Sequence, residues 1–222
     1  MVENKYWALK LTAIIVFIHF IKVLVGEPFT ELFVLNYNTY LLHPWTLVSS
    51  VFLHSNMGHL LVNGLMLALF GSILESIIGS KRFLTLFFAA GIVASFAAIF
   101  LHPIQVLIDP SNIFVFRALG ASGAIYGIFG ALMVIRPRMI VWLHFPVPMW
   151  MAGIIYILQD LLGLFLPDNI GHFAHLGGLF FGLFFGLALI KKYKEKRKKS
   201  VKKDIMITKE EFENWEKQTF NV

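Results

Sequence analysis

Residues 117–134, RALGASGAIYGIFGALMV, form an apolar run with one serine inside it. After Arg117 the run contains no charged residue, and its length approaches the ~20 residues that a helix needs to cross a bilayer core. Its glycines would let a second helix approach closely. Ser122 is therefore either a small residue at a helix contact or a nucleophile held below the membrane surface.

The composition of the whole chain is that of a membrane protein. Its 222 residues are 58% hydrophobic and 14% charged, whereas soluble domains carry about 25% charged residues. The mean hydropathy is +0.74, so we expect one integral membrane domain. The absence of cysteine excludes disulfides, thiolate metal ligands and a cysteine nucleophile. The first apolar stretch lacks a small-residue cleavage site, which favours a retained span over a removed signal peptide.

Six apolar segments predict six membrane-spanning helices. They lie at about 9–25, 58–79, 83–102, 119–136, 147–166 and 170–190. The loop between the first two is apolar and aromatic but contains Pro28 and Pro44, which indicates an interfacial or re-entrant segment. The predicted fold is thus an all-α membrane protein, a bundle of six transmembrane helices within residues 1–190, with an interfacial first loop. Residues 191–222 form a basic tail whose last part has the pattern of a short helix.

Basic residues predict the orientation of these spans, because cytoplasmic loops carry an excess of lysine and arginine. With six spans, one side of the membrane receives Lys5, Lys10, Lys81, Arg82, Arg136, Arg138 and the basic tail. The opposite side carries Arg117, with Lys22 late in the first span. We therefore expect a multi-pass protein of the cell membrane with both termini in the cytoplasm. The tail is a topology signal first and a contact for anionic lipid second.

Three spans then bring polar residues to one depth near the extracytoplasmic side. Ser122 begins the fourth span, His59 begins the second, and His172 and His175 begin the sixth. His59 and Asn63 are four residues apart, so they share one helix face. They form either an interhelical hydrogen-bond pair or two donors for a developing oxyanion.

A serine nucleophile needs a base within hydrogen-bond reach, and the sixth span offers two histidines. Glycines recur on the stripe that contains His175, and His172 lies on nearly the same stripe, so periodicity does not choose between them. The acidic residues on the outer side are Asp109, Asp160 and Asp168. No pattern marks any of the three as a partner, so we expect a serine–histidine dyad without a carboxylate. Tyr126, one turn after Ser122, is expected to pack against the imidazole.

Three separated motifs resemble those of the rhomboid intramembrane serine proteases, over about residues 10–190. HLLVN at 59–63, GASG at 120–123 and AHLGGLFFG at 174–182 fit the family patterns HxxxN, GxSG and AHxxGxxxG. The resemblance implies that Ser122 is the nucleophile and that His175, rather than His172, is the base.

The resemblance also implies supporting roles for other residues. It implies an oxyanion hole made by His59, Asn63 and the backbone N–H of Ser122, with Tyr126, Gly120 and Gly123 as supporting residues. Glu75 matches a structural position near the cytoplasmic end of the second span. One position departs from the family: Thr46 follows Trp45, where members often carry the arginine that helps to order the first loop.

The implied activity is hydrolysis of a peptide bond in or near a transmembrane helix of another protein. The reaction would pass through an acyl-enzyme on Ser122 near the outer membrane interface, and it would need no metal, cofactor or nucleic acid. Expected substrates are single-span or multi-span membrane proteins with small or helix-breaking residues near the cut. The resemblance further implies that they enter between the second and fifth spans.

Two other functions remain open at this point. His54, His59, His172 and His175 could form a metal site of an enzyme or transporter, although no acidic ligand joins them within a short motif. A non-catalytic client-binding protein could also use the same fold, although the intact Ser122 and His175 count against it. Loss of function on addition of a chelator would indicate the metal site. Unchanged function of the Ser122→Ala variant would indicate the client-binding protein.

Overall fold

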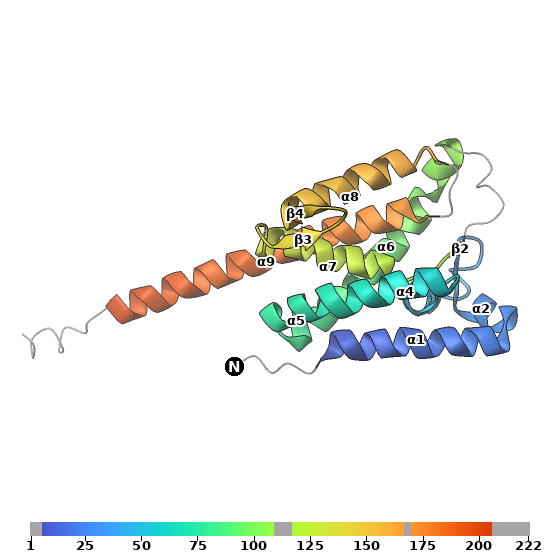
Figure 1. The fold of residues 1–222 in the computed structure, drawn as a ribbon, viewed down its shortest axis with the longest axis horizontal. Helices are drawn as coiled ribbons and strands as arrows, with labels where there is room; N and C mark the ends of the chain where they lie inside the picture. Colours follow the sequence, from blue (N-terminus) through green and yellow to red (C-terminus); the bar gives the residue numbers. More distant parts are fainter. Residues whose placement is uncertain (1–5, 109–116, 167–169, 206–222) are drawn as a thin grey trace, which may run out of the picture. The chain divides into compact units, whose positions relative to one another are not determined.

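The computed structural model describes residues 6–108, 117–166 and 170–205, with side chains up to residue 191. Most of these residues are helical (Figure 1). The helices are α1 Trp7–Val25, α2 Glu27–Phe33, α3 Thr46–Ser49, α4 Met57–Met66, α5 Ser72–Ile78, α6 Ser80–Ile108, α7 Ser122–Ile135, α8 Met149–Gly163 and α9 His172–Ile205. The 3₁₀ turn Ser50–Phe52 follows α3, and the π-helical segment Leu67–Gly71 joins α4 to α5.

Two short antiparallel pairs complete the described structure. Strand β1, Leu35–Asn36, pairs with β2, Arg117–Ala118, and so connects the first loop to the segment that enters α7. Strand β3, Ile140–Trp142, pairs with β4, Pro146–Pro148, in the hairpin between α7 and α8.

Four described helices are long and apolar enough to cross a membrane. They are Trp7–Val25, Met57–Ile78, Ser80–Ile108 and His172–Lys191. Helices α7 and α8 are also apolar but have only 14 and 15 residues. The prediction of a helical membrane protein is confirmed, and the fourth and fifth predicted spans correspond to helices shorter than the ~20 residues of a full crossing.

Small residues bring α7 close to two neighbouring helices. A Cβ atom added to Gly123 or Gly127 would overlap the Cβ of an alanine on α6. A Cβ added to Gly182 on α9 would overlap the carbonyl oxygen of Gly127. Helix α7 also contacts α4 and α8, and it runs through the middle of the helices in Figure 1. The glycine stripes therefore serve close backbone packing around α7.

The chain divides into two compact units, Met1–Gly186 and Leu187–Val222. The first contains α1 to α8 and the part of α9 that carries the histidines, and in the second α9 continues to Ile205. The predicted short helix of the tail lies beyond residue 205, outside the described residues, so it stays a prediction, as does the lipid contact of the tail.

The first loop is anchored without an arginine after Trp45. The Trp45 indole N–H donates to the Leu32 carbonyl at 2.8 Å, and the Ser49 hydroxyl donates to the Phe33 carbonyl at 2.9 Å. Thr46 is buried, and its hydroxyl donates to the His43 carbonyl at 2.6 Å. These three hydrogen bonds hold the first loop, in which Thr46 follows Trp45.

Glu75 of α5 contacts the start of α1. Its carboxylate is buried and accepts the backbone N–H groups of Trp7 and Ala8 at 3.0 and 2.9 Å. These N–H groups have no partner within α1, because the first turn of a helix leaves its donors free. Glu75 thus caps α1 through tertiary structure.

Candidate active site

Ser122 is the first residue of α7, and Gly120 makes the turn that leads into it. Gly120 has φ 128°, a backbone conformation that favours glycine. A Cβ at this position would also lie 2.7 Å from Cε1 and 2.9 Å from Nε2 of the His59 ring. Gly120 is therefore needed twice, for its backbone angle and for the approach of His59 to the turn before Ser122.

His175 on α9 lies between Ser122 and two other side chains. Its Nε2 is 2.9 Å from the Ser122 Oγ, and its Nδ1 is 3.0 Å from Oδ1 of Asp160 on α8. Tyr126 stacks on its ring, with centroids 4.2 Å apart and planes inclined by 13°. Helices α7 and α8 thus contact the imidazole of His175 at its two nitrogens and one face, and the packing predicted for Tyr126 is present.

The prediction that this histidine has no carboxylate partner is wrong. Asp160 is buried, and its Oδ1 lies within hydrogen-bond distance of His175 and, at 2.7 Å, of the His172 Nδ1. His172, the other candidate base, thus contacts Asp160, whereas His175 contacts the Ser122 Oγ. Asp109 and Asp168, the other acidic residues considered, lie outside the described residues.

A signal for Asp160 does exist in the sequence, in the hairpin geometry of α8 and α9. Positions equidistant from the middle of a helix–helix connection lie at similar depth in the two antiparallel helices. Asp160 and His175 are nearly symmetric about residues 167 and 168. Depth alone does not show which faces of the two helices meet, so only the packed structure brings these side chains together.

His59 and Asn63 lie on α4 as the sequence predicts, with different partners. The Ser55 backbone N–H points to the His59 Nδ1 at 3.5 Å, and the Ser55 hydroxyl lies 3.1 Å from the same atom. The Nδ2 of Asn63 donates to the His59 carbonyl at 2.8 Å. Because a backbone N–H can only donate, this contact favours a neutral His59 ring with Nδ1 as the acceptor and the proton on Nε2, beside Gly120.

One cavity of about 650 Å³ joins these groups. Its lining includes Ser122, His175, His59, Asn63 and Tyr126, together with apolar side chains of α4 and α7. Gly123, predicted as a supporting residue, lines the same cavity and packs against α6. The predicted site residues therefore line one cavity.

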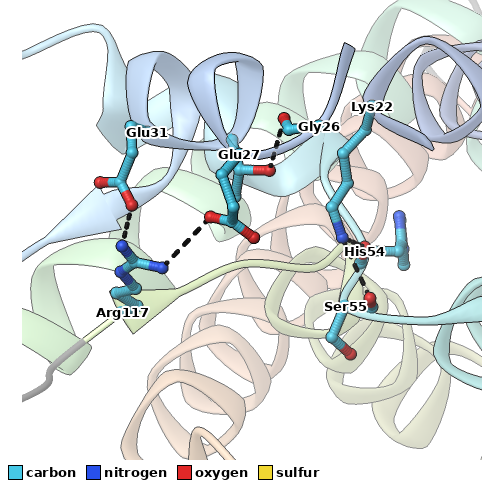
Figure 2. Close-up of polar contacts among 8 residues, drawn as sticks. Lys22, Gly26, Glu27, Glu31, His54, Ser55 and Arg117 are labelled. Atoms are coloured by element: carbon cyan, nitrogen blue, oxygen red, sulfur yellow. Dashed lines mark hydrogen bonds and ion pairs between the residues drawn. The ribbon is translucent and has the colours of Figure 1, made fainter. Parts of the chain in front are cut away.

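Two cationic side chains tie α1 and α2 to the segments that enter the site (Figure 2). Lys22 at the end of α1 donates to the carbonyls of His54 and Ser55, at 2.7 and 3.0 Å. Arg117 forms ion pairs with Glu31 and, at 3.6 Å, with Glu27 on α2. The first pair of contacts holds the chain just before α4, and the second holds the chain before Ser122.

His54 is a buried neutral neighbour of the site. It lies before α4, is fully buried, and its ring centroid is 5.1 Å from that of His59. Burial, reinforced by the nearby His59, lowers the pKa of His54 to about 3. The ring therefore carries no charge at neutral pH.

The four histidines of the metal hypothesis form two separate pairs, His54 with His59 and His172 with His175. Within the described part of the chain, the group whose ligand atoms could hold a metal is Asp160, His172 and His175, with those atoms within 4.8 Å of one another. His54 and His59 are not part of it. The separations of 2.7 and 3.0 Å from the Asp160 Oδ1 to the two Nδ1 atoms are those of hydrogen bonds.

Comparisons with known proteins give a consistent assignment. A family model described as the rhomboid domain matches residues 42–192. The chain is 28% identical to a putative rhomboid protease of Bacillus subtilis, YdcA, over 69% of this chain and 70% of that protein. It is 33% identical to the rhomboid protease GluP of the same organism, over 65% of this chain and 26% of that protein. It is 27% identical to the mitochondrial rhomboid protein 1 of Saccharomyces cerevisiae, over 77% of this chain and 49% of that protein.

These relatives differ in length from the chain. The match spans about a quarter of GluP and about half of the yeast protein. The family match over residues 42–192 covers α3 to α8 and the first part of α9, and it contains Ser122, His175, His59 and Asn63.

Proposed function

Because this chain belongs to the rhomboid family, we propose that it is an intramembrane serine protease. It would cleave a peptide bond of another membrane protein through an acyl-enzyme on Ser122, with His175 as general base. The observation that carries the proposal is the 2.9 Å contact between the Ser122 Oγ and the His175 Nε2. This contact lies in a cavity that also contains His59 and Asn63.

The proposed architecture has six spans, with α7 and α8 as the two short ones. A helix of 14 residues is ~21 Å long at ~1.5 Å per residue, about 9 Å less than the ~30 Å hydrocarbon core. If Arg136 and Arg138 after α7 mark the cytoplasmic surface, Ser122 lies inside the opposite boundary by that difference. The termini would be cytoplasmic and the site would open to the extracytoplasmic side of a cell membrane.

The reaction follows from the positions of two atoms. The Ser122 Oγ attacks the scissile carbonyl carbon while the His175 Nε2 takes the hydroxyl proton. The C–N bond then breaks, and the leaving amine receives that proton from His175. Water attacks the acyl-enzyme next, and its proton passes through Nε2 back to the serine oxygen as the carboxylic acid leaves.

Negative charge on the substrate oxygen needs donors that are already in place. The backbone N–H of Ser122 is one, because the first residues of a helix have no intrahelical acceptor. The Nε2–H of His59 beside Gly120 is the second, and the second N–H of the Asn63 amide is the third.

The substrates would be single-span or multi-span membrane proteins. A helix keeps its carbonyls in internal bonds, so a segment with small or helix-breaking residues reaches Ser122 most readily. Entry between the second span (α4 and α5) and the fifth (α8) is part of the proposal. The lipid bilayer, with anionic lipid at the basic tail, is the other proposed partner.

The proposal is tested by a fluorophosphonate probe on the full chain in detergent, together with cleavage of a generic transmembrane reporter. We expect labelling and cleavage in wild type and the loss of both in Ser122→Ala and His175→Ala. Ser76→Ala and His144→Ala are matched controls, because both side chains are exposed and outside the cavity, and they should react like wild type.

Two results would refute the proposal. Folded wild type that neither labels nor cleaves, yet still binds the reporter, would indicate the client-binding function. Activity that a chelator abolishes would indicate the metal function.

A further inference from the structure

We propose that Asp160 is a positioning residue that fixes the tautomer and the orientation of His175, so that the site works as a serine–histidine–aspartate set. The inference rests on the proposed function for its kinetic consequences, whereas its structural content concerns only the contacts of the imidazole. It goes beyond the dyad that the sequence motifs imply, because Asp160 lies outside all three motifs.

The first argument is the direction of the hydrogen bonds. An ionised carboxylate only accepts, so Asp160 Oδ1 requires a proton on the Nδ1 of His175, 3.0 Å away. A neutral imidazole with a proton on Nδ1 has a lone pair on Nε2. That lone pair faces the Ser122 Oγ at 2.9 Å, which is the arrangement needed to take the serine proton.

The second argument is the burial of the carboxylate. The side chain of Asp160 is 3% exposed, and a buried carboxylate is costly unless charged or polar partners satisfy it. His175 and His172 both point their Nδ1 atoms at its Oδ1. When His175 takes the proton from Ser122, the imidazolium gains an adjacent negative charge, which stabilises it during the reaction.

The third argument is that α8 is shaped to receive His172. Gly163 lies one turn after Asp160, and a Cβ there would overlap the His172 ring. Asp160 and Gly163 therefore form a socket for this imidazole, which is 4% exposed. His172 bonds the same Oδ1 atom that faces His175, so the carboxylate cannot rotate away from His175 without breaking a buried bond.

The decisive variant is Asp160→Asn, which keeps the size of the side chain and changes its hydrogen bonding. An amide that turns its NH₂ toward His175 favours the tautomer with the proton on Nε2, which cannot accept the serine proton. We expect kcat and the labelling rate of Ser122 to fall by more than about tenfold and by up to ~10⁴-fold, the loss for the equivalent change in a serine protease triad. KM should change less than about threefold, since Asp160 does not touch the substrate.

The conservative and neighbouring variants separate positioning from folding. Asp160→Glu retains a carboxylate acceptor. Its kcat and labelling rate should be at least tenfold higher than those of Asp160→Asn. Gln159→Ala is the matched control, because Gln159 is exposed and adjacent on the same helix, and it should keep the wild-type rate.

A second readout does not depend on activity. In the full chain labelled with ¹⁵N-histidine, the signals of His175, assigned by their loss in His175→Ala, should show a protonated Nδ1 and an unprotonated Nε2. Asp160→Asn should change this pattern, and Gln159→Ala should not. A wild type without protease activity but with this tautomer, reversed in Asp160→Asn, would uphold the positioning role while refuting the protease.

The proposal is overturned by any of three results. Asp160→Asn could keep more than a third of the wild-type rate. Its His175 tautomer could match that of wild type. A chelator could abolish labelling and Zn²⁺ restore it, which would assign Asp160, His172 and His175 to a metal.

Discussion

At the scale of single residues, the two imidazoles of the site differ in what their Nδ1 atoms contact. The Nδ1 of His59 faces the N–H and the hydroxyl of Ser55, whereas the Nδ1 of His175 faces the carboxylate of Asp160. A donor at Nδ1 leaves the proton on Nε2, and an acceptor at Nδ1 leaves a lone pair there. In the proposed mechanism, the two neighbours thus prepare one ring to donate to an oxyanion and the other to accept a proton.

Ser55→Ala tests this role for His59. The variant removes the hydroxyl and keeps the longer backbone contact, so we expect kcat to fall about fivefold, since one neutral hydrogen bond contributes ~1 kcal/mol. KM should stay within a factor of two, because Ser55 acts through His59. Steady-state cleavage of a transmembrane reporter measures both constants. Ser55→Thr retains the hydroxyl and should remain near wild type; equal losses in both variants would contradict the explanation.

At the scale of secondary-structure elements, the distance between α7 and α9 determines whether the serine and histidine meet. The two helices approach through glycine, with Gly182 against the carbonyl of Gly127. Ser122 and His175 lie on the same two helices, one at the start of α7 and the other in the first turn of α9. Any side chain that separates these backbones also lengthens the contact at the site.

Gly182→Ala should therefore affect stability and chemistry together. Overpacking of this kind costs ~1–3 kcal/mol, and we expect the labelling rate of Ser122 to fall at least tenfold at a temperature where the variant is folded. Gly64→Ala is the matched control, because its Cβ would meet Thr12 Cγ2 at an ordinary 3.6 Å. Thermal unfolding followed beside probe labelling separates the two effects. Normal labelling in a destabilised Gly182→Ala would show that the helix distance does not control the site.

At the scale of the whole molecule, contacts far apart in the sequence hold the entrances to α4 and α7. Lys22 bonds the carbonyls of His54 and Ser55, 32 and 33 residues away. Strand β1 of the first loop pairs with β2 next to the turn that leads to Ser122. The long first loop is thus part of the support of the site, although it supplies none of the proposed reacting groups.

Lys22→Met tests this long-range support. The variant keeps an apolar stem and removes two bonds from a charged donor, so we expect kcat to fall three- to tenfold and the unfolding temperature to decrease. Combined with Ser55→Ala, the loss in kcat should be smaller than the product of the single losses, because both act on His59. Lys10→Met, an exposed lysine over the Trp7 ring, is the control. Fully multiplicative losses would show that Lys22 does not act through His59.

The sequence alone determined the class of the protein and the residues of its motifs. Apolar run length predicts membrane helices because the bilayer core has a fixed thickness, and the spacing of His59 and Asn63 on one face follows from helix geometry. The glycine stripes likewise predict close helix packing, which the contacts of Gly182 and Gly127 bear out.

Which groups from different helices meet depends on how the helices pack in the tertiary structure. Helix periodicity places a side chain on a face but does not give the rotation of one helix against another, so Asp160 carries no local mark of its contact with His175. The same holds for Glu75, whose partners are backbone groups of α1, and for Lys22, whose partners are carbonyls of the loop. Such contacts depend on the packing of whole helices, which no short stretch of sequence contains.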